Sequence, residues 1–190
     1  MKYNESMSAL PQTRMTVDEF LAWAEGRPGR YELFRGSVYA MTPERTGHGE
    51  VKFAVQTALA KAIRARGLPC RMLPDGMTVR IDDATAHEPD ALVYCGPRLA
   101  PSSIEVPSPI IIVEVLSPTT RNIHATIKLA GYFRVPSVMH YLIIDPEKPL
   151  VLHHARNADG TILTRIVNDG VIALDPPGIE IAVAEIYAAA

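Results

Sequence analysis

The sequence has few cysteines, no long apolar run and no excess of positive charge, the features that are typical of disulfide-rich secreted, membrane-spanning and strongly basic DNA-binding proteins. It holds 2 cysteines among 190 residues. Cys70 and Cys95 lack zinc-ligand spacing, so we expect reduced thiols in a cytoplasmic protein. No apolar run approaches the ~20 residues that span a bilayer, and the first residues lack a signal peptide's apolar stretch, so no membrane partner is expected. A formal net charge of −2 argues against holding nucleic acid by charge neutralisation alone.

What the sequence does have is enough apolar content for one folded core. Apolar residues make up 47% and charged residues 21%, a balance that excludes wholesale disorder. The length corresponds to a single domain. We expect residues 1–13 to form a loose arm and residues 14–190 to form that domain.

Local patterns predict an alternation of helices and strands. Thr16 and Glu19 form a capping-box signature ahead of a short helix. Apolar residues at helical spacing predict an amphipathic helix that ends at Gly67, with lysines and arginines along its outer side. The strands expected from β-rich runs are a hairpin at 31–41, short strands around 70–73, 77–81 and 90–94, a buried strand at 110–116, and a further strand at 140–144. A third helix is expected between the last two strands, running to about Arg134.

This order indicates a mixed sheet with helices packed on it, of the α/β or α+β class, with β-rich additions at both ends of the chain. The short runs after residue 150 are typical of strands and turns.

Glu114 is the most informative single residue. It follows four apolar residues in a strand that is expected to be buried on both faces. A buried bare charge costs several kcal/mol, so this carboxylate must be paired, neutralised or bound to a metal. The alternative is a side chain at a sheet edge, or one that pairs with Arg121.

Asp90 begins another strand directly after Pro89. Across neighbouring strands, Asp90 and Glu114 can face each other. Two carboxylates suit Mg²⁺ or Mn²⁺, which need one or two protein carboxylates plus other oxygen ligands. Taken alone, Asp90 is equally typical of a solvated turn.

Lys128 follows Glu114 by 14 residues, in the helix that leaves the Glu114 strand. Its ammonium is placed to reach back over the sheet, where it can orient water or neutralise a phosphate. Two acids, a divalent cation and a lysine fit phosphodiester hydrolysis. The sequence has no P-loop, dinucleotide fingerprint or serine nucleophile elbow.

These motifs together resemble a known family. The segments that carry the resemblance are Tyr31-Glu32-Leu33 with Gly36, His48, Pro89-Asp90, Val113-Glu114-Val115-Leu116-Ser117-Pro118, Lys128 with Tyr132, and His140–Pro146. They are similar to the Uma-two family of restriction-endonuclease-like proteins, part of the PD-(D/E)XK nuclease superfamily. The resemblance runs from about Met15 to Tyr187.

The resemblance implies an αβββαβ core and a Mg²⁺ or Mn²⁺ ion held by Asp90, Glu114 and the Val115 carbonyl. It implies that Lys128 replaces the superfamily lysine, whose usual position is Leu116 here, and that Glu32 is a further site carboxylate. His48 maps to a family histidine; we expect His48 and Lys52, on the basic helix, and His124 to lie at the substrate side. His124 stands where relatives often carry an aspartate.

Three functions follow as alternatives. The first is a metal-dependent DNA endonuclease that contacts the phosphate backbone. Leu116, His124 and the acidic net charge favour the second, a catalytically silent nuclease fold that binds nucleic acid or protein. The third is an assembly domain, such as a homodimer formed through the β-rich ends. A homodimer is also the expected state of the nuclease.

Overall fold

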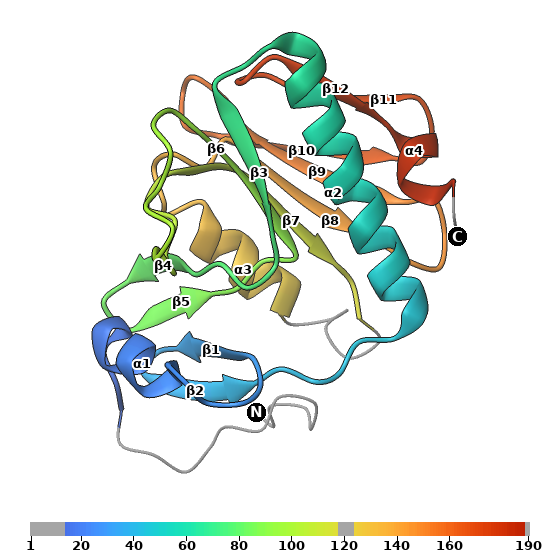
Figure 1. Cartoon of the computed structure of the whole chain (residues 1–190). Coiled ribbons are helices and arrows are strands. Elements are labelled where there is room, and N and C mark those ends of the chain that lie inside the picture. Colours follow the sequence, from blue (N-terminus) through green and yellow to red (C-terminus); the bar gives the residue numbers. More distant parts are fainter. Residues whose placement is uncertain (1–13, 118–123, 189–190) are drawn as a thin grey trace.

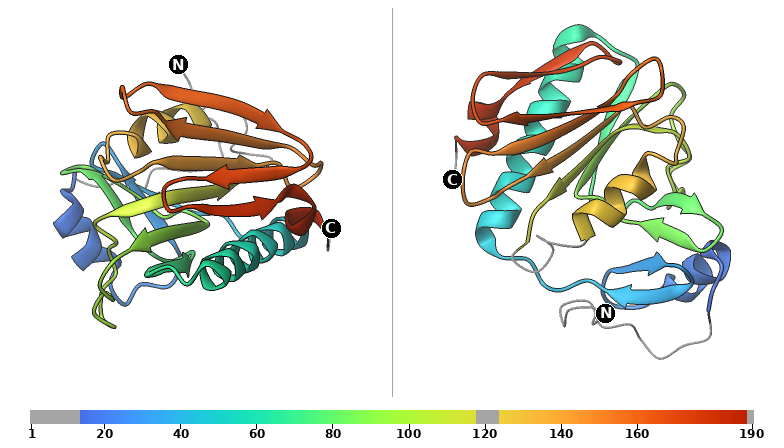
Figure 2. Two further views of the ribbon diagram at one scale, coloured as in Figure 1. Left: turned by 90° about the horizontal axis from the view of Figure 1, so that it is seen from above. Right: turned by 180° about the vertical axis from the view of Figure 1, so that it is seen from behind.

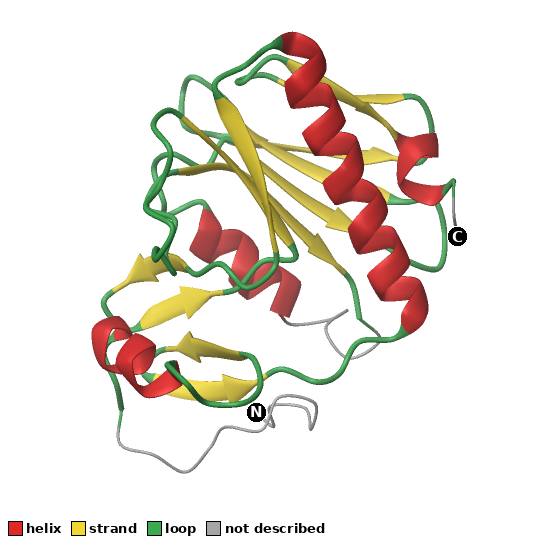
Figure 3. Ribbon diagram, in the orientation of Figure 1, coloured by secondary structure: helices red, strands yellow, loops and turns green. Residues whose placement is uncertain are grey.

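The structure is a computed structural model that describes residues 14–117 and 124–188 (Figure 1). Its strands, yellow in Figure 3, form three sheets of four, six and two strands. The expected arm at residues 1–13 lies outside the described residues.

The four-stranded sheet comes from the first half of the chain. Helix α1 (Val17–Ala24) begins with the expected capping box, in which Glu19 N–H donates to Thr16 Oγ1 and Thr16 N–H donates to Glu19. The sheet order is β2-β1-β5-β4, and its strands are β1 (Tyr31–Phe34), β2 (Ser37–Ala40), β4 (Val79–Asp82) and β5 (Thr85–His87). The hairpin expected at 31–41 is therefore confirmed as β1 and β2.

The six-stranded sheet is the main scaffold. Its order is β10-β9-β8-β7-β6-β3, and only β7 and β8 run parallel, so the sheet is mixed as expected. Its strands are β3 (Cys70–Pro74), β6 (Ala91–Cys95), β7 (Pro109–Val115), β8 (His140–Ile144), β9 (Val151–Arg156) and β10 (Ile162–Val167).

The two long helices cover opposite faces of this sheet (Figures 1 and 2). Helix α2 (Thr46–Arg66) packs in one core cluster with Ile111, Val113 and Val115 of β7. Helix α3 (His124–Tyr132) contributes Tyr132 to another cluster, with Ile112 of β7. Side chains alternate between the faces of a strand, so β7 is buried on both sides because each face has its own helix.

The C-terminal segment adds a hairpin and a short helix beside α2. Strands β11 (Val171–Leu174) and β12 (Ile179–Ala182) pair with each other, and α4 (Val183–Tyr187) follows directly. Their apolar side chains join the α2 side of the core. No helix within the described ranges is long and apolar enough to cross a membrane.

The αβββαβ core is present, but one expected strand belongs elsewhere. The core runs α2, β3, β6, β7, α3, β8. The strand expected around 77–81 exists as β4, yet it leaves the main sheet and pairs with β5, a strand that the sequence analysis missed. Strand β5 is three residues long and lies between turns, so it carries too little periodicity to be recognised.

The expectation of two reduced thiols is wrong for this structure. Cys70 of β3 lies directly opposite Cys95 of β6, and the two form a disulfide. They are 25 residues apart in sequence, so only the antiparallel register of the strands brings the sulfurs together.

Candidate active site

The candidate site lies where β6 begins and β7 ends. Ala91 pairs with Val113, so the next position in the register places Asp90 opposite Glu114. Asp90 N–H donates to the Val113 carbonyl at 3.0 Å. Two acids that are 24 positions apart in the sequence thus meet at one end of neighbouring strands.

Glu114 is part of a buried cluster on the α3 side of the sheet. Lys128 Nζ donates to Glu114 Oε1 at 2.9 Å and to Glu32 Oε1 at 2.8 Å. Tyr132 OH donates to the same Glu114 oxygen at 2.7 Å. One helical turn separates Lys128 from Tyr132, so a single face of α3 supplies both donors.

The N-terminal sheet completes this cluster through Glu32 of β1. Glu88 N–H donates to Glu32 Oε1 at 2.9 Å, and His87 Nδ1 lies 3.6 Å from Glu32 Oε2. Each sheet therefore provides one of the two carboxylates that hold Lys128. We call these residues (Glu32, Glu114, Lys128 and Tyr132) the α3-side cluster.

Burial and charge act on these groups in opposite directions. Burial raises the pKa of Glu114, and Lys128 only partly offsets this. Burial also acts to raise the pKa of Glu32, but Lys128 and His87 outweigh it and lower that pKa below its ordinary value. Burial acts to lower the pKa of Lys128, yet Glu114 and Glu32 raise it, so the amine stays protonated.

Asp90 faces the other half of the site. Its Oδ2 accepts a 2.7 Å hydrogen bond from Val115 N–H, and its own carbonyl accepts one from Gln56 of α2. His48, in the first turn of α2, places Nε2 3.0 Å from the Val115 carbonyl oxygen and 3.7 Å from Asp90 Oδ2. Burial raises the pKa of Asp90, opposed first by His48 and then by the Val115 N–H.

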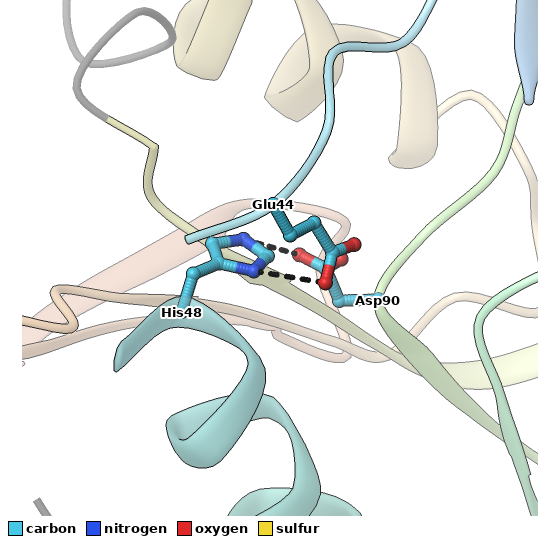
Figure 4. A group of neighbouring side chains, drawn as sticks. All are labelled: Glu44, His48 and Asp90. Atoms are coloured by element: carbon cyan, nitrogen blue, oxygen red, sulfur yellow. Dashed lines mark ion pairs between the residues drawn. The ribbon is translucent and has the colours of Figure 1, made fainter. Parts of the chain in front are cut away.

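A second lysine lies behind His48. Lys52 Nζ contacts Glu44 Oε1 at 2.6 Å and Asp75 Oδ2 at 3.0 Å. Arg30 pairs with the same two acids, at 2.9 Å and 2.7 Å. Glu44 Oε2 in turn lies 3.4 Å from His48 Nδ1, so the two ring nitrogens of His48 each face one carboxylate, Glu44 or Asp90 (Figure 4). We call Glu44, His48, Lys52, Asp75 and Arg30 the α2-side cluster.

Most residues that the sequence analysis selected meet around the end of β7. Asp90, Glu114 and the Val115 carbonyl lie there, with Lys128 and Glu32 on the α3 side and His48 on the α2 side. Lys52, expected at DNA phosphates, instead has its ammonium engaged by Glu44 and Asp75, with its side chain 11% exposed. The side chains of His124 and Arg121 lie outside the described residues.

The sequence analysis did not select Glu44, Asp75, Arg30 or His87. Glu44, His48 and Lys52 recur every four residues, which is a helical spacing that places them on one side of α2 and its entry. That signal was available in the sequence. Nothing local connects Asp75 or Arg30 to the site, because each arrives from a different loop.

A mixed six-stranded sheet with helices on both faces, and with acids and a lysine at the end of its central strand, defines a protein of the restriction-endonuclease-like fold class. The family model Uma2, described as "Putative restriction endonuclease", matches residues 17–184. The chain belongs to this family, as the resemblance implied.

Two individual proteins are similar to this chain over most of its length. An uncharacterized protein of Synechocystis sp., slr1290, is 27% identical over 180 residues, 93% of each chain. A crystal structure described as a putative nuclease belonging to DUF820, from Anabaena variabilis, has a TM-score of 0.74 at 15% identity, and the match covers 92% of this chain and 98% of that one. The second likeness is evidence for the fold.

Proposed function

We propose that this protein is a metal-dependent DNA endonuclease that hydrolyses phosphodiester bonds. The observation that carries the proposal is the meeting of Asp90, Glu114 and Lys128 around the end of β7, in a chain of a restriction-endonuclease-like family. Water attacks phosphorus, the opposite P–O bond breaks, and the departing oxygen takes a proton, so each cut consumes one water.

The donor set fits Mg²⁺ or Mn²⁺. Asp90 Oδ2 is fixed by the Val115 N–H, and Glu114 Oε1 is fixed by Lys128 and Tyr132. Each carboxylate is thereby held in place by the protein, and its remaining lone pairs are available to a cation together with the Val115 carbonyl. Asp90, Glu114 and the Val115 carbonyl would hold such a cation, which would supply Lewis-acid polarisation of the phosphate and a lower pKa for the attacking water.

Lys128 supplies fixed positive charge in this proposal. Two carboxylates contact its ammonium, so it stays protonated and stabilises the negative charge that develops on the phosphate. Glu32 positions Lys128 from the opposite sheet. A hydrogen bond from Glu88 N–H holds the Glu32 carboxylate in place.

The proposed substrate is the DNA backbone, because none of the chemistry described requires a particular base. One site cuts one strand. Cutting both strands in one event calls for two copies of the site, so the homodimer is part of the proposal, and the molar mass in solution tests it.

The test of the proposal is plasmid nicking with Mg²⁺ or Mn²⁺, comparing the wild type with Asp90→Asn and Lys128→Met. We expect each variant to lose at least ~100-fold in rate, as is typical when one charge-stabilising group is removed. A surface variant, Glu50→Gln, is the matched control and should cleave normally. Cleavage that persists in Asp90→Asn at the wild-type rate would rule out this site.

A further inference from the structure

The α2-side cluster places an imidazole beside the proposed metal ligands. His48 Nε2 lies 3.0 Å from the Val115 carbonyl oxygen and 3.7 Å from Asp90 Oδ2. Adjacent ligands of an octahedral ion with ~2.1 Å contacts lie about 3.0 Å apart, and opposite ligands about 4.2 Å. Both separations from Nε2 fall within this range. The 3.0 Å contact is a hydrogen bond in this structure, and an ion would replace the Nε2 proton between the imidazole and the carbonyl.

The other ring nitrogen faces a carboxylate. His48 Nδ1 is buried without a hydrogen bond, and Glu44 Oε2 lies 3.4 Å away (Figure 4). A histidine that binds a metal through Nε2 carries its proton on Nδ1 and commonly donates it to a carboxylate, which fixes the ring. Glu44 lies where that acceptor is needed.

Glu44 is itself fixed by two cations. Lys52 contacts both of its oxygens, and Arg30 contacts Oε1. A carboxylate already neutralised in this way is better suited to orient a ligand than to be one. Asp90, in contrast, takes its 2.7 Å hydrogen bond from a backbone N–H, and no lysine or arginine in the described ranges forms an ion pair with its carboxylate.

We propose that His48 Nε2 is a nitrogen ligand of the divalent cation, beside Asp90 and the Val115 carbonyl, and that Glu44 and Lys52 are positioning residues for its ring. This inference rests on the proposed metal site and adds a nitrogen ligand to its oxygen ligands. In this proposal, the buried Lys52–Glu44 pair supports metal binding, and Lys52 does not contact DNA.

A nitrogen ligand changes which cation the site prefers. Mg²⁺ favours all-oxygen sites, whereas imidazole suits later transition metals, and affinity at such mixed sites rises along the first-row series. The wild type should therefore bind Mn²⁺ more tightly than Mg²⁺. His48→Gln should weaken Mn²⁺ more than Mg²⁺ and bring the two affinities closer together.

The decisive experiment uses Mn²⁺ alone, without DNA. Pulsed electron paramagnetic resonance of the Mn²⁺-loaded wild type should show ¹⁴N modulation from a directly bound imidazole. The modulation should persist in the surface control Glu50→Gln and disappear in His48→Gln. Calorimetry should show Glu44→Ala and Lys52→Met binding Mn²⁺ about 10- to 100-fold more weakly while keeping the modulation, the effect expected of residues that orient a ligand.

The outcomes separate this inference from the proposed function. Mn²⁺ bound by the wild type without ¹⁴N modulation, and lost in Asp90→Asn, overturns the histidine ligand and leaves the nuclease proposal standing. Failure of the wild type to bind Mn²⁺ overturns both. Because the wild-type spectrum carries the result, a poorly folded His48→Gln variant does not obscure it; circular dichroism checks that variant's fold.

Discussion

Two buried lysines lie on opposite faces of the same sheet, each between two carboxylates. Lys128 joins Glu32 and Glu114 in the α3-side cluster, and Lys52 joins Glu44 and Asp75 in the α2-side cluster. Their side chains are equally enclosed, at 12% and 11% exposed. The difference lies in the second cation: Arg30 pairs with both acids beside Lys52, whereas no arginine contacts Glu32 or Glu114 in the described part of the chain.

In the proposed function, this difference distinguishes the cluster that takes part in the reaction from the cluster that supports it. The α2-side cluster has two cations for three neighbouring acids, because Arg30 also pairs with Glu88 at 2.6 Å, so its negative charge is offset more fully than that of the α3-side cluster. The α3-side cluster has one lysine for two acids, and Asp90 adds further negative charge nearby, which is one cause of the raised pKa of Glu114. A surplus of buried negative charge is the electrostatic condition that a divalent cation relieves.

The largest expected effect is that of Lys128→Met. The substitution leaves two buried carboxylates without their shared cation, so we expect it to lower the free energy of unfolding by about 3–5 kcal/mol. Urea denaturation at pH 7 measures this. A loss below about 1 kcal/mol would show that Glu114 already lacks its charge in the wild type.

The two acids beside Lys128 should respond differently to amide substitution. The pKa of Glu32 is lowered, so its ionised form stabilises the fold above pH ~4.5, and this contribution is lost as the pH falls through the folded-state pKa. The pKa of Glu114 is raised, so its ionised form destabilises the fold. This destabilisation disappears as the pH falls toward 4.5 and the carboxyl takes up a proton.

We therefore expect Glu32→Gln to cost about 2–3 kcal/mol at pH 7, and Glu114→Gln less than about 1 kcal/mol. The difference between the two variants in free energy of unfolding should become smaller below pH ~4.5. Urea denaturation across pH 3–8 checks both signs, and equal costs for the two variants at pH 7 would contradict the assignment.

Lys52→Met should cost less than Lys128→Met, although the two side chains are equally buried. Arg30 continues to neutralise Glu44 and Asp75, so we expect about 1–2 kcal/mol. Measured beside Lys128→Met under the same conditions, this variant tests whether the second cation decides the difference. Equal losses would mean that Arg30 does not compensate.

The smallest effect on stability should come from substitution of Lys61, which lies on α2 together with Lys52. Lys61 pairs with Glu185 of α4, but its side chain is 68% exposed. Exposed pairs contribute little, so Lys61→Met should change the free energy of unfolding by no more than about 0.5 kcal/mol. A larger loss of stability would indicate that the apolar stem of Lys61 packs against α4. In that case we expect Lys61→Arg, which keeps a long apolar stem and the charge, to retain the wild-type stability.

The local sequence accounts for much of this molecule because several of its signals act over short distances. The capping box at Thr16, the helical apolar spacing of α2 and the apolar run of β7 each reflect contacts within a few residues or one repeating face. Glu114 was identified because its carboxylate interrupts that apolar run, and a buried charge is costly unless it has a partner.

Tertiary structure alone decided which partner each charge received. Strand β5 pairs with β1 in the N-terminal sheet, where Glu32 contacts Lys128. The register of β3 with β6 places Cys70 opposite Cys95. Arg30, Asp75 and Lys52 meet from three distant segments. Pairing energies depend on distances of a few ångströms between residues far apart in sequence, and only the folded sheets set those distances.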